Sequence, residues 1–429
     1  MTLLIKNGTV VDPGKMTVKK NDVLIEDRVI TKIGKNIEQE ADQIIDATDC
    51  YVMPGFVDLH VHLRDPGFEY KETVDTGAKS AARGGFTTIL AMPNTKPVAD
   101  NEEIIKYIEN KARDLAPIKV RQIGAITKGQ KGRELADIEG MVKAGSPAIS
   151  EDGKSVKDSS IYVVGLREAA RCNIPVFAHC EDKELAAGGV MNSGETARKL
   201  NLPGIPNAAE DVIIARDIVL AKEAGARLHI CHVATAMGID LIDWAKRKGW
   251  QVSGEVCPHH FTLCDEDITE DNAAFKMNPP LRSRHDLEAV RKGIADDVID
   301  VIATDHAPHS QEEKGGSMMG SAFGIVGLET AAALTYTELV KKDVITIEKM
   351  AAKMSLNPAK IIGLNRGKVQ KGEIADLVVF NPNVEWTIDP KNFASKGKST
   401  PFGGRKVYGR VINTIFSGKI VYEYAPQII

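Results

Sequence analysis

The sequence lacks several features that would assign it to a specialised class. It has no apolar run of the ~18 residues that a membrane-spanning helix needs. It has no sustained basic block, and its formal net charge of -4 disfavours a nucleic-acid partner or an anionic membrane surface. Its six cysteines show no Cys-x-x-Cys spacing and are too sparse for a disulfide framework. Because the opening MTLLIKNGTVVDPG also lacks the pattern of a signal peptide, we expect a cytoplasmic protein.

Both ends of the chain are rich in short β-type runs separated by Asn/Gly and Asp/Pro turns. The 429 residues are 43% hydrophobic, which is enough for a large core and more than one domain. A few strands from one end could not bury a face alone. We therefore predict one small β-sandwich built from both termini, residues 1–54 plus 365–429.

Strand and helix patterns alternate through residues 55–364, which we predict to be the second domain. Eight strand candidates occur at residues 56–63, 86–94, 119–127, 147–152, 175–180, 227–235, 250–260 and 298–308. Helical patterns separate them, for example at residues 101–116, 162–173, 210–225 and 240–249. Eight alternations over about 300 residues favour a (β/α)₈ barrel over an open, doubly wound sheet.

Unusual polar residues gather where the predicted strands end. The set comprises four histidines and two aspartates: His60, His62, Asp152, His179, His232 and Asp305. A lone histidine in a strand is usually structural, but this set terminates five strands of one barrel, whose active site lies at the carboxyl ends of its strands. Such ligands suffice for two divalent ions of the zinc type.

The loops above these strand ends carry candidate substrate contacts. Arg64 lies two residues beyond a candidate ligand, where a guanidinium is suited to bidentate capture of a carboxylate. Asn94 and Asn278 can orient an amide or a carboxylate, although asparagine in a loop is often only a turn residue. His309 can reach a substrate from the last loop. The glycine-rich residues 312–324 allow close backbone approach to a ligand, or are simply mobile.

Seven segments together resemble one enzyme family. They are PGFVDLHVHLRDPG, AMPNTKPVAD, ISEDG, AHCED, LHICHVAT, KMNPPLR and ATDHAPHSQEEK. In this order, over residues 55–358, they are similar to the bacterial class I dihydroorotases of the amidohydrolase superfamily. The resemblance implies two zinc ions per chain and reversible cyclisation of N-carbamoyl-L-aspartate to L-dihydroorotate in pyrimidine biosynthesis. It also implies a homodimer, and allows aspartate transcarbamoylase as a partner.

The resemblance also implies a role for each matching residue. The metal ligands would be His60, His62, Asp152, His179, His232 and Asp305. Asp305 would in addition be the catalytic proton carrier. The substrate contacts would be Arg64, Asn94, Asn278 and His309, with backbone groups near Ala322 and Gly324.

One departure and several rival functions stay open. Many members of the superfamily bridge their metals with a carboxylated lysine, whereas here Asp152 ends the fourth strand and Lys154 lies beyond a glycine. Dihydropyrimidinase, hydantoinase and allantoinase would share the metals, but their neutral rings would leave the guanidinium of Arg64 unpaired. A non-catalytic partner of aspartate transcarbamoylase is the remaining alternative. Such proteins typically lose metal ligands, and this chain keeps all six.

Overall fold

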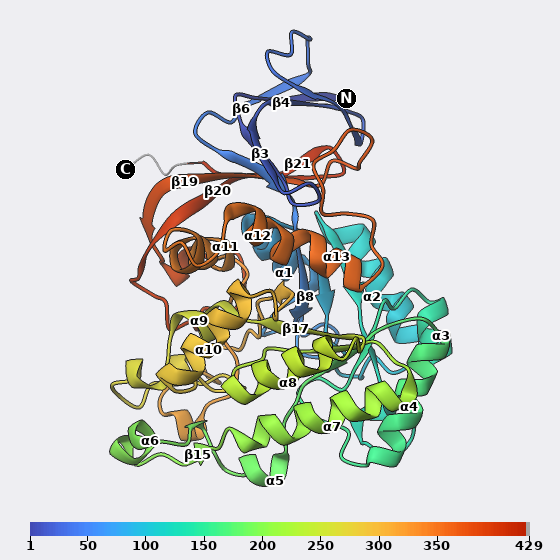
Figure 1. The fold of residues 1–429 in the computed structure, drawn as a ribbon, viewed down its shortest axis with the longest axis vertical. Coiled ribbons are helices and arrows are strands. Elements are labelled where there is room, and N and C mark those ends of the chain that lie inside the picture. The colour runs from blue at the N-terminus through green and yellow to red at the C-terminus, as the bar shows by residue number, and fades with distance from the viewer. Residues whose placement is uncertain (426–429) are drawn as a thin grey trace.

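Strands from both ends of the chain form two sheets at one end of the molecule (Figure 1). The computed structural model describes residues 1–425. A four-stranded sheet has the order β5-β4-β1-β6 and contains β1 (Thr2–Lys6), β4 (Asp22–Glu26), β5 (Val29–Gly34) and β6 (Gln43–Asp46). A six-stranded sheet has the order β21-β20-β19-β7-β2-β3 and contains β2 (Thr9–Asp12), β3 (Thr17–Lys20), β7 (Tyr51–Pro54), β19 (Leu377–Thr387), β20 (Lys406–Phe416) and β21 (Lys419–Glu423).

The two ends of the chain share one hydrophobic core. β19 pairs antiparallel with β7, so a C-terminal strand lies beside an N-terminal one. The core contains Leu3, Ile25 and Val52 from the first part of the chain together with Leu377 and Ile415 from the last. This packing is that of the predicted sandwich made from both termini. The exact boundaries, 1–54 plus 365–429 and 55–364, stay a prediction, and residues 426–429 lie outside the described residues.

Parallel strands form the barrel. They are β8 (Phe56–Val61), β9 (Phe86–Ala91), β10 (Lys119–Gln122), β11 (Gly124–Ala125), β12 (Ile149–Ser150), β13 (Val176–Ala178), β16 (Leu228–Ile230), β17 (Val252–Val256) and β18 (Val301–Ile302). They pair in the orders β10-β9-β8 and β11-β12-β13-β16-β17-β18, and β10 and β11 are two halves of one predicted strand. Beyond β18, His306 forms a parallel bridge with Val61, which brings the last strand beside the first. All eight predicted strands are therefore present, in the predicted order.

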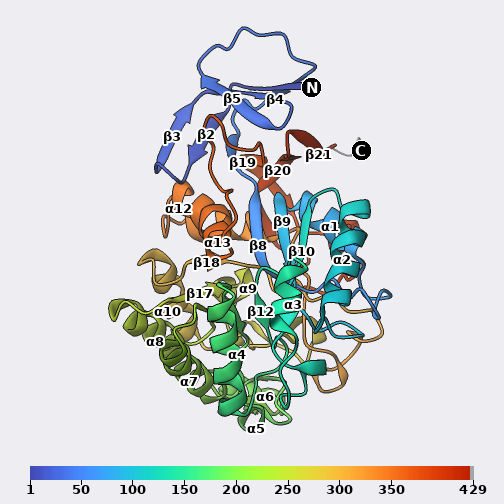
Figure 2. The same ribbon diagram turned by 90° about the vertical axis from the view of Figure 1, so that its right-hand side faces the viewer.

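Helices surround the strands (Figures 1 and 2). They are α1 (Val74–Arg83), α2 (Glu102–Leu115), α3 (Ile138–Lys143), α4 (Ser159–Arg171), α5 (Lys183–Ala186), α6 (Glu195–Leu200), α7 (Ala208–Ala224), α8 (Ala236–Arg247), α9 (Pro258–Thr262), α10 (Arg284–Ala295), α11 (Ala331–Thr335), α12 (Ile347–Ala351) and α13 (Asn357–Ile361). Two short strands, β14 (Met191–Asn192) and β15 (Gly204–Ile205), pair beside α5 and α6. Among the described residues, no helix is both long and apolar enough to cross a membrane.

Helix α2 shows how the sequence specifies these helices. The side chain of Asn101 caps its first turn by accepting a backbone hydrogen bond. Ile105, Ile108 and Ala112 recur at spacings of three and four residues and are buried, which is the pattern of a helix with one apolar face. That face packs against β10.

The connection between the sandwich and the barrel determines which end of the barrel is open for a binding site. β7 belongs to the sandwich and leads directly into β8. The amino ends of the barrel strands therefore face the sandwich, and their carboxyl ends face away from it. The loops at the carboxyl ends are free to surround a cavity.

Candidate active site

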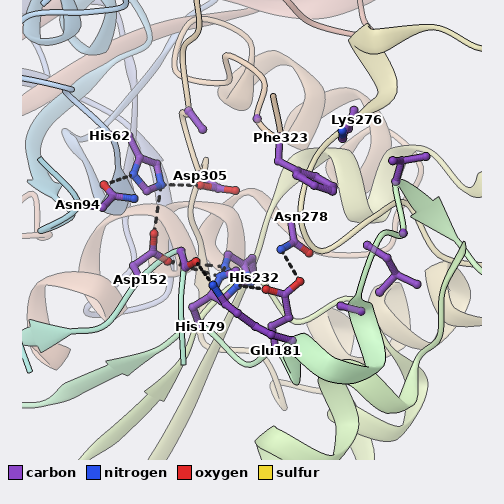
Figure 3. Close-up of a pocket in the computed structure, with 18 of the residues that line it drawn as sticks. His62, Asn94, Asp152, His179, Glu181, His232, Lys276, Asn278, Asp305 and Phe323 are labelled. Carbon is purple, nitrogen blue, oxygen red and sulfur yellow. Dashed lines mark hydrogen bonds and ion pairs between the residues drawn. The ribbon is translucent and has the colours of Figure 1, made fainter. Parts of the chain in front are cut away.

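The structure brings all six predicted metal ligands together. Figure 3 shows five of them, His62, Asp152, His179, His232 and Asp305. Asp152 lies at the centre of the group, with four imidazole nitrogens around its carboxylate. The distances to an Asp152 oxygen are 3.2 Å from His60 Nε2, 3.5 Å from His62 Nε2, 3.6 Å from His179 Nδ1 and 3.9 Å from His232 Nε2. Asp305 completes the set, with Oδ1 3.1 Å from His62 Nε2.

The donor atoms of this group fit divalent metal ions of the zinc type. His60 Nε2 and Asp152 Oδ1 are buried without a hydrogen-bond partner in the described part of the chain, although buried polar atoms are normally paired. Two overlapping sets, one of His60, His62 and Asp305 and one of His60, Asp152 and His232, each have ligand atoms within 4.8 Å of one another. Imidazole nitrogens and carboxylate oxygens are among the ligands that bind zinc in catalytic sites.

Other side chains hold the far nitrogens of two of these histidines. His60 Nδ1 donates to Glu255 Oε1 at 2.7 Å, and His62 Nδ1 donates to Asn94 Oδ1 at 2.9 Å. Each bond fixes the tautomer of the ring and directs its Nε2 towards the group. The predicted substrate contact Asn94 therefore also orients a candidate ligand.

Glu255 is a functional candidate that the sequence reasoning missed. It is fully buried on β17, where it also accepts a hydrogen bond of 3.0 Å from His229 Nε2. Burial alone would raise the pKa of its carboxyl, but the hydrogen bonds from His229 and His60 lower that pKa to about 2. A charged residue inside an otherwise buried strand was the available signal, because an unpaired buried charge is costly.

Three residues of the site have strained backbone conformations. Arg64, His232 and Asp305 have φ values of 61°, 35° and 48°. The left-handed region costs a non-glycine residue about 1–3 kcal/mol when the surrounding structure imposes it. All three lie just beyond strands β8, β16 and β18, where the chain turns at the carboxyl end of the barrel. The strain is therefore concentrated at the candidate site.

A cavity of about 610 Å³ opens above the metal-ligand group. Arg64, Asn94, Asn278 and His309, the four predicted side-chain contacts, all line it. Arg64 Nε donates to Pro308 O at 3.2 Å, and no carboxylate of the described chain lies within ion-pair distance of its guanidinium. Burial lowers the pKa of Arg64 from its usual value. A half-buried cation on a cavity wall, without a carboxylate partner in the described chain, is suited to an anionic ligand.

His309 is held as a neutral imidazole. Its Nε2 lies 2.8 Å from Phe323 O, and its Nδ1 lies 3.4 Å from Lys71 Nζ. Burial, followed by the charges of Arg64 and Lys71, lowers the pKa of His309 to about 3. The side chain therefore adds no charge near neutral pH, whereas Arg64, which lines the same cavity, carries a positive charge.

The backbone groups near Ala322 and Gly324 are engaged within the protein. Ala322 N donates to Glu313 O at 2.9 Å, and Gly324 N donates to Lys276 O at 3.0 Å. Of the described residues, Gly324 lines the cavity and Ala322 does not. A substrate contact through either N–H would need these bonds to open. Three further charged residues that line the cavity were not predicted: Glu181, Lys183 and Lys276.

The alternative bridging residue lies away from the metal-ligand group. Lys154 is exposed, and its Nζ donates to Gln130 O at 3.0 Å. It lines a separate surface hollow rather than the cavity above Asp152. This placement favours Asp152 over a carboxylated lysine as the residue at the centre of the metal-ligand group.

Comparisons with known proteins agree with this geometry. A family model described as "Dihydro-orotase-like" matches residues 50–237. A dihydroorotase of Acetivibrio thermocellus is 48% identical over 419 residues, covering 98% of each chain. One of Pelotomaculum thermopropionicum is 48% identical over 424 residues, covering 99% of each chain.

Solved structures with the same fold are more distant in sequence. An L-hydantoinase (dihydropyrimidinase) from Arthrobacter aurescens has a TM-score of 0.88 at 26% identity, covering 100% of this chain and 97% of its own. A D-hydantoinase (dihydropyrimidinase) from Thermus sp. has a TM-score of 0.84 at 27% identity, covering 99% of this chain and 97% of its own. These similarities confirm the predicted barrel with its β-sandwich. With nearly half of its residues shared along its whole length with curated relatives, the chain belongs to the dihydroorotase family of enzymes.

Proposed function

We propose that this protein catalyses the reversible cyclisation of N-carbamoyl-L-aspartate to L-dihydroorotate in pyrimidine biosynthesis. The relatives at 48% identity bear the name dihydroorotase. The observation that carries the proposal is the guanidinium of Arg64, which lines the cavity without an ion-pair partner in the described chain. Among cyclic amides, dihydroorotate supplies the ring carboxylate that such a cation would bind.

The proposed cofactor is a pair of zinc ions. The residues that would hold them are His60, His62, Asp152, His179, His232 and Asp305. The central position of Asp152 suits a carboxylate shared by both ions. When bound, zinc would lower the pKa of a coordinated water towards ~7 and polarise the attacked carbonyl.

Asp305 is suited to carry the proton. It lines the cavity, and His60 and His62 lower the pKa of its carboxyl despite the opposing effect of burial. The group is therefore ionised near neutral pH, and from its place in the cavity it would accept a proton from the attacking water and deliver it to the departing ring nitrogen. In ring closure the same group works in reverse. Arg64, Asn94 and His309 would hold the substrate carboxylate and fix the ring over the metal-ligand group.

The main alternative is a hydantoinase or dihydropyrimidinase activity, because structures bearing those names share the whole fold. Allantoinase belongs to the same group of rivals. None of their rings carries a carboxylate for Arg64, so a half-buried cation would remain without a counter-charge. A non-catalytic role is disfavoured, because the complete set of candidate metal ligands is present and assembled. The homodimer and the partnership with aspartate transcarbamoylase stay predictions from the resemblance, and the cytoplasmic location stays a prediction from the N-terminal sequence and the sparse cysteines.

The proposal is tested by ring opening of L-dihydroorotate by zinc-loaded protein, with dihydrouracil alongside. We expect turnover of dihydroorotate alone, and its loss in Arg64→Ala. Arg133→Ala, which alters an exposed arginine outside the cavity, is the matched control and should behave as wild type. Preference for dihydrouracil would overturn the substrate assignment. Inactivity on both substrates with zinc bound would contradict the activity and point to a scaffold or a missing partner.

A further inference from the structure

Glu181 faces two functional residues at once. It lies two positions after His179, between β13 and α5, and it lines the cavity. Its Oε1 accepts a hydrogen bond of 2.9 Å from Asn278 Nδ2, and its Oε2 lies 3.6 Å from His179 Nε2. Figure 3 shows the carboxylate between these two side chains. Neither the family resemblance nor the sequence reasoning assigns it a role.

On one side, Glu181 completes a pattern in the metal-ligand group. The Nδ1 of His179 faces the group, 3.6 Å from Asp152 Oδ1, so its Nε2 faces away. That Nε2 is buried and has no hydrogen-bond partner among the described residues. Its carboxylate neighbour is Glu181. His60 and His62 have their far nitrogens hydrogen-bonded, to Glu255 and Asn94 respectively, and Glu181 occupies the corresponding position at His179, 3.6 Å away.

On the other side, Glu181 decides which end of the Asn278 amide is available. An ionised carboxylate only accepts hydrogen bonds, so the NH₂ end of Asn278 turns towards Glu181. The amide oxygen and the second N–H then remain for a ligand in the cavity. A cyclic amide offers an N–H and a carbonyl, which match this acceptor and this donor.

We propose that Glu181 is a positioning residue that orients the ring of His179 and the amide of Asn278 together, and so couples metal binding to recognition of the cyclic amide. The claim that Glu181 orients Asn278 for the substrate, which we call the substrate part, rests on the proposed dihydroorotase activity. The claim that Glu181 orients His179 for metal binding, which we call the metal part, rests only on the contacts of His179.

The substrate part is tested with a double-mutant cycle. Glu181→Ala, Asn278→Ala and the double variant are compared in zinc-loaded form for kcat and KM with dihydroorotate. We expect Glu181→Ala to lower kcat/KM by about 10- to 100-fold, the range typical for residues that orient metal ligands. The route through Asn278 is read in KM, because the route through His179 stays open in the Asn278→Ala background. We expect the KM of the double variant to be no more than about threefold above that of Asn278→Ala. Multiplicative increases in KM, or a Glu181→Ala variant equal to wild type, would overturn the coupling.

The metal part is tested by chelator competition for bound zinc, which requires no activity. We expect Glu181→Ala to release zinc at about 10- to 100-fold lower chelator concentration. Glu184→Ala, an exposed glutamate on α5, is the control and should leave zinc affinity unchanged. If wild type binds zinc but does not open dihydroorotate, the proposed function fails while this readout still decides the role of Glu181 at His179.

A conservative variant covers the case in which Glu181→Ala does not fold. Glu181→Gln keeps the shape of the side chain but offers one acceptor oxygen where the carboxylate offers two. It can therefore serve either Asn278 or His179, and we expect either KM or zinc affinity to change while the other stays near wild type. If neither changes in a folded Glu181→Gln protein, the proposal is wrong.

Discussion

The sandwich and the far end of the barrel lie at opposite ends of the molecule (Figure 2), and each contains a buried aspartate whose hydrogen bonding differs from that of the other. In the sandwich, Asp22 accepts backbone hydrogen bonds on both oxygens, from Asn7 N at 2.8 Å and Ile37 N at 2.9 Å. At the barrel end, Asp152 is equally buried, yet its Oδ1 has no hydrogen-bond partner in the described chain. A buried carboxylate whose oxygens are both hydrogen-bonded stabilises the fold. A buried carboxylate oxygen that lies among imidazoles without a hydrogen bond is available to bind a ligand.

The largest effect should follow a change at the barrel end. We expect Asp305→Asn to lower kcat by about 100- to 10,000-fold, because an amide cannot accept and return the proton. Zinc should stay largely bound, since the histidines and Asp152 remain. Steady-state kinetics and metal analysis of the purified variant measure both quantities. Near-normal turnover would contradict the assignment of Asp305 as the proton carrier.

A change in the sandwich should affect stability without affecting chemistry. Ile5 has no exposed surface and belongs to the core shared by both chain ends. We expect Ile5→Ala to lower the free energy of unfolding by about 2–5 kcal/mol, because it removes buried apolar atoms and leaves a cavity. Chemical denaturation measures the loss, and KM at a permissive temperature should match wild type. A large change in KM would show that the two ends are coupled.

A substitution of Glu255 tests whether a fully hydrogen-bonded carboxylate at the barrel end contributes to metal binding. Glu255→Gln keeps the shape but weakens the charged hydrogen bonds to His60 and His229. We expect zinc affinity to fall by about 10- to 100-fold, as for other residues that orient a ligand. Chelator competition measures it, with Glu38→Gln on the sandwich surface as the control. Unchanged affinity would place Glu255 with Asp22, as a purely structural carboxylate.

The smallest expected effect is on the pH dependence of the free energy of unfolding, and it arises from Lys314 in the loop over the cavity. Lys314 Nζ donates to Lys276 O at 2.9 Å and Ala322 O at 3.0 Å, and burial, assisted by the charge of Lys276, lowers the pKa of Lys314 to about 7. An unfolded chain keeps a lysine pKa of about 10.4. Between these values the unfolded state binds more protons, so this group makes the free energy of unfolding rise with pH from about 7 to 10.4.

Lys314→Met removes that dependence. We expect the melting temperature of wild type, relative to this variant, to increase as pH is raised through the window. Lys342→Met, which alters an exposed lysine, should not reproduce the trend. A difference that stays constant from pH 7 to pH 10 would show that Lys314 is not buried as a largely neutral amine.

Residues at strand ends were predictable because barrel topology brings them together. His60, His62 and His179 follow apolar strand patterns, and every parallel strand ends at the same face. Glu255 and Glu181 were missed, because their roles depend on partners in other strands and loops. The hydrogen bond from Ala322 N to Glu313 O could not be predicted either, because it depends on how one loop folds back on itself.

The sequence by itself determined the alternation of strands and helices, the six candidate ligands and the arginine beyond the first strand. Local periodicity and residue chemistry are sufficient for these features. Only the tertiary structure decided which nitrogen of each imidazole faces Asp152, and which carboxylates hold the opposite nitrogens. The reason is physical: a ring orientation is set by hydrogen bonds whose two partners lie far apart in the chain and meet only when the barrel has formed.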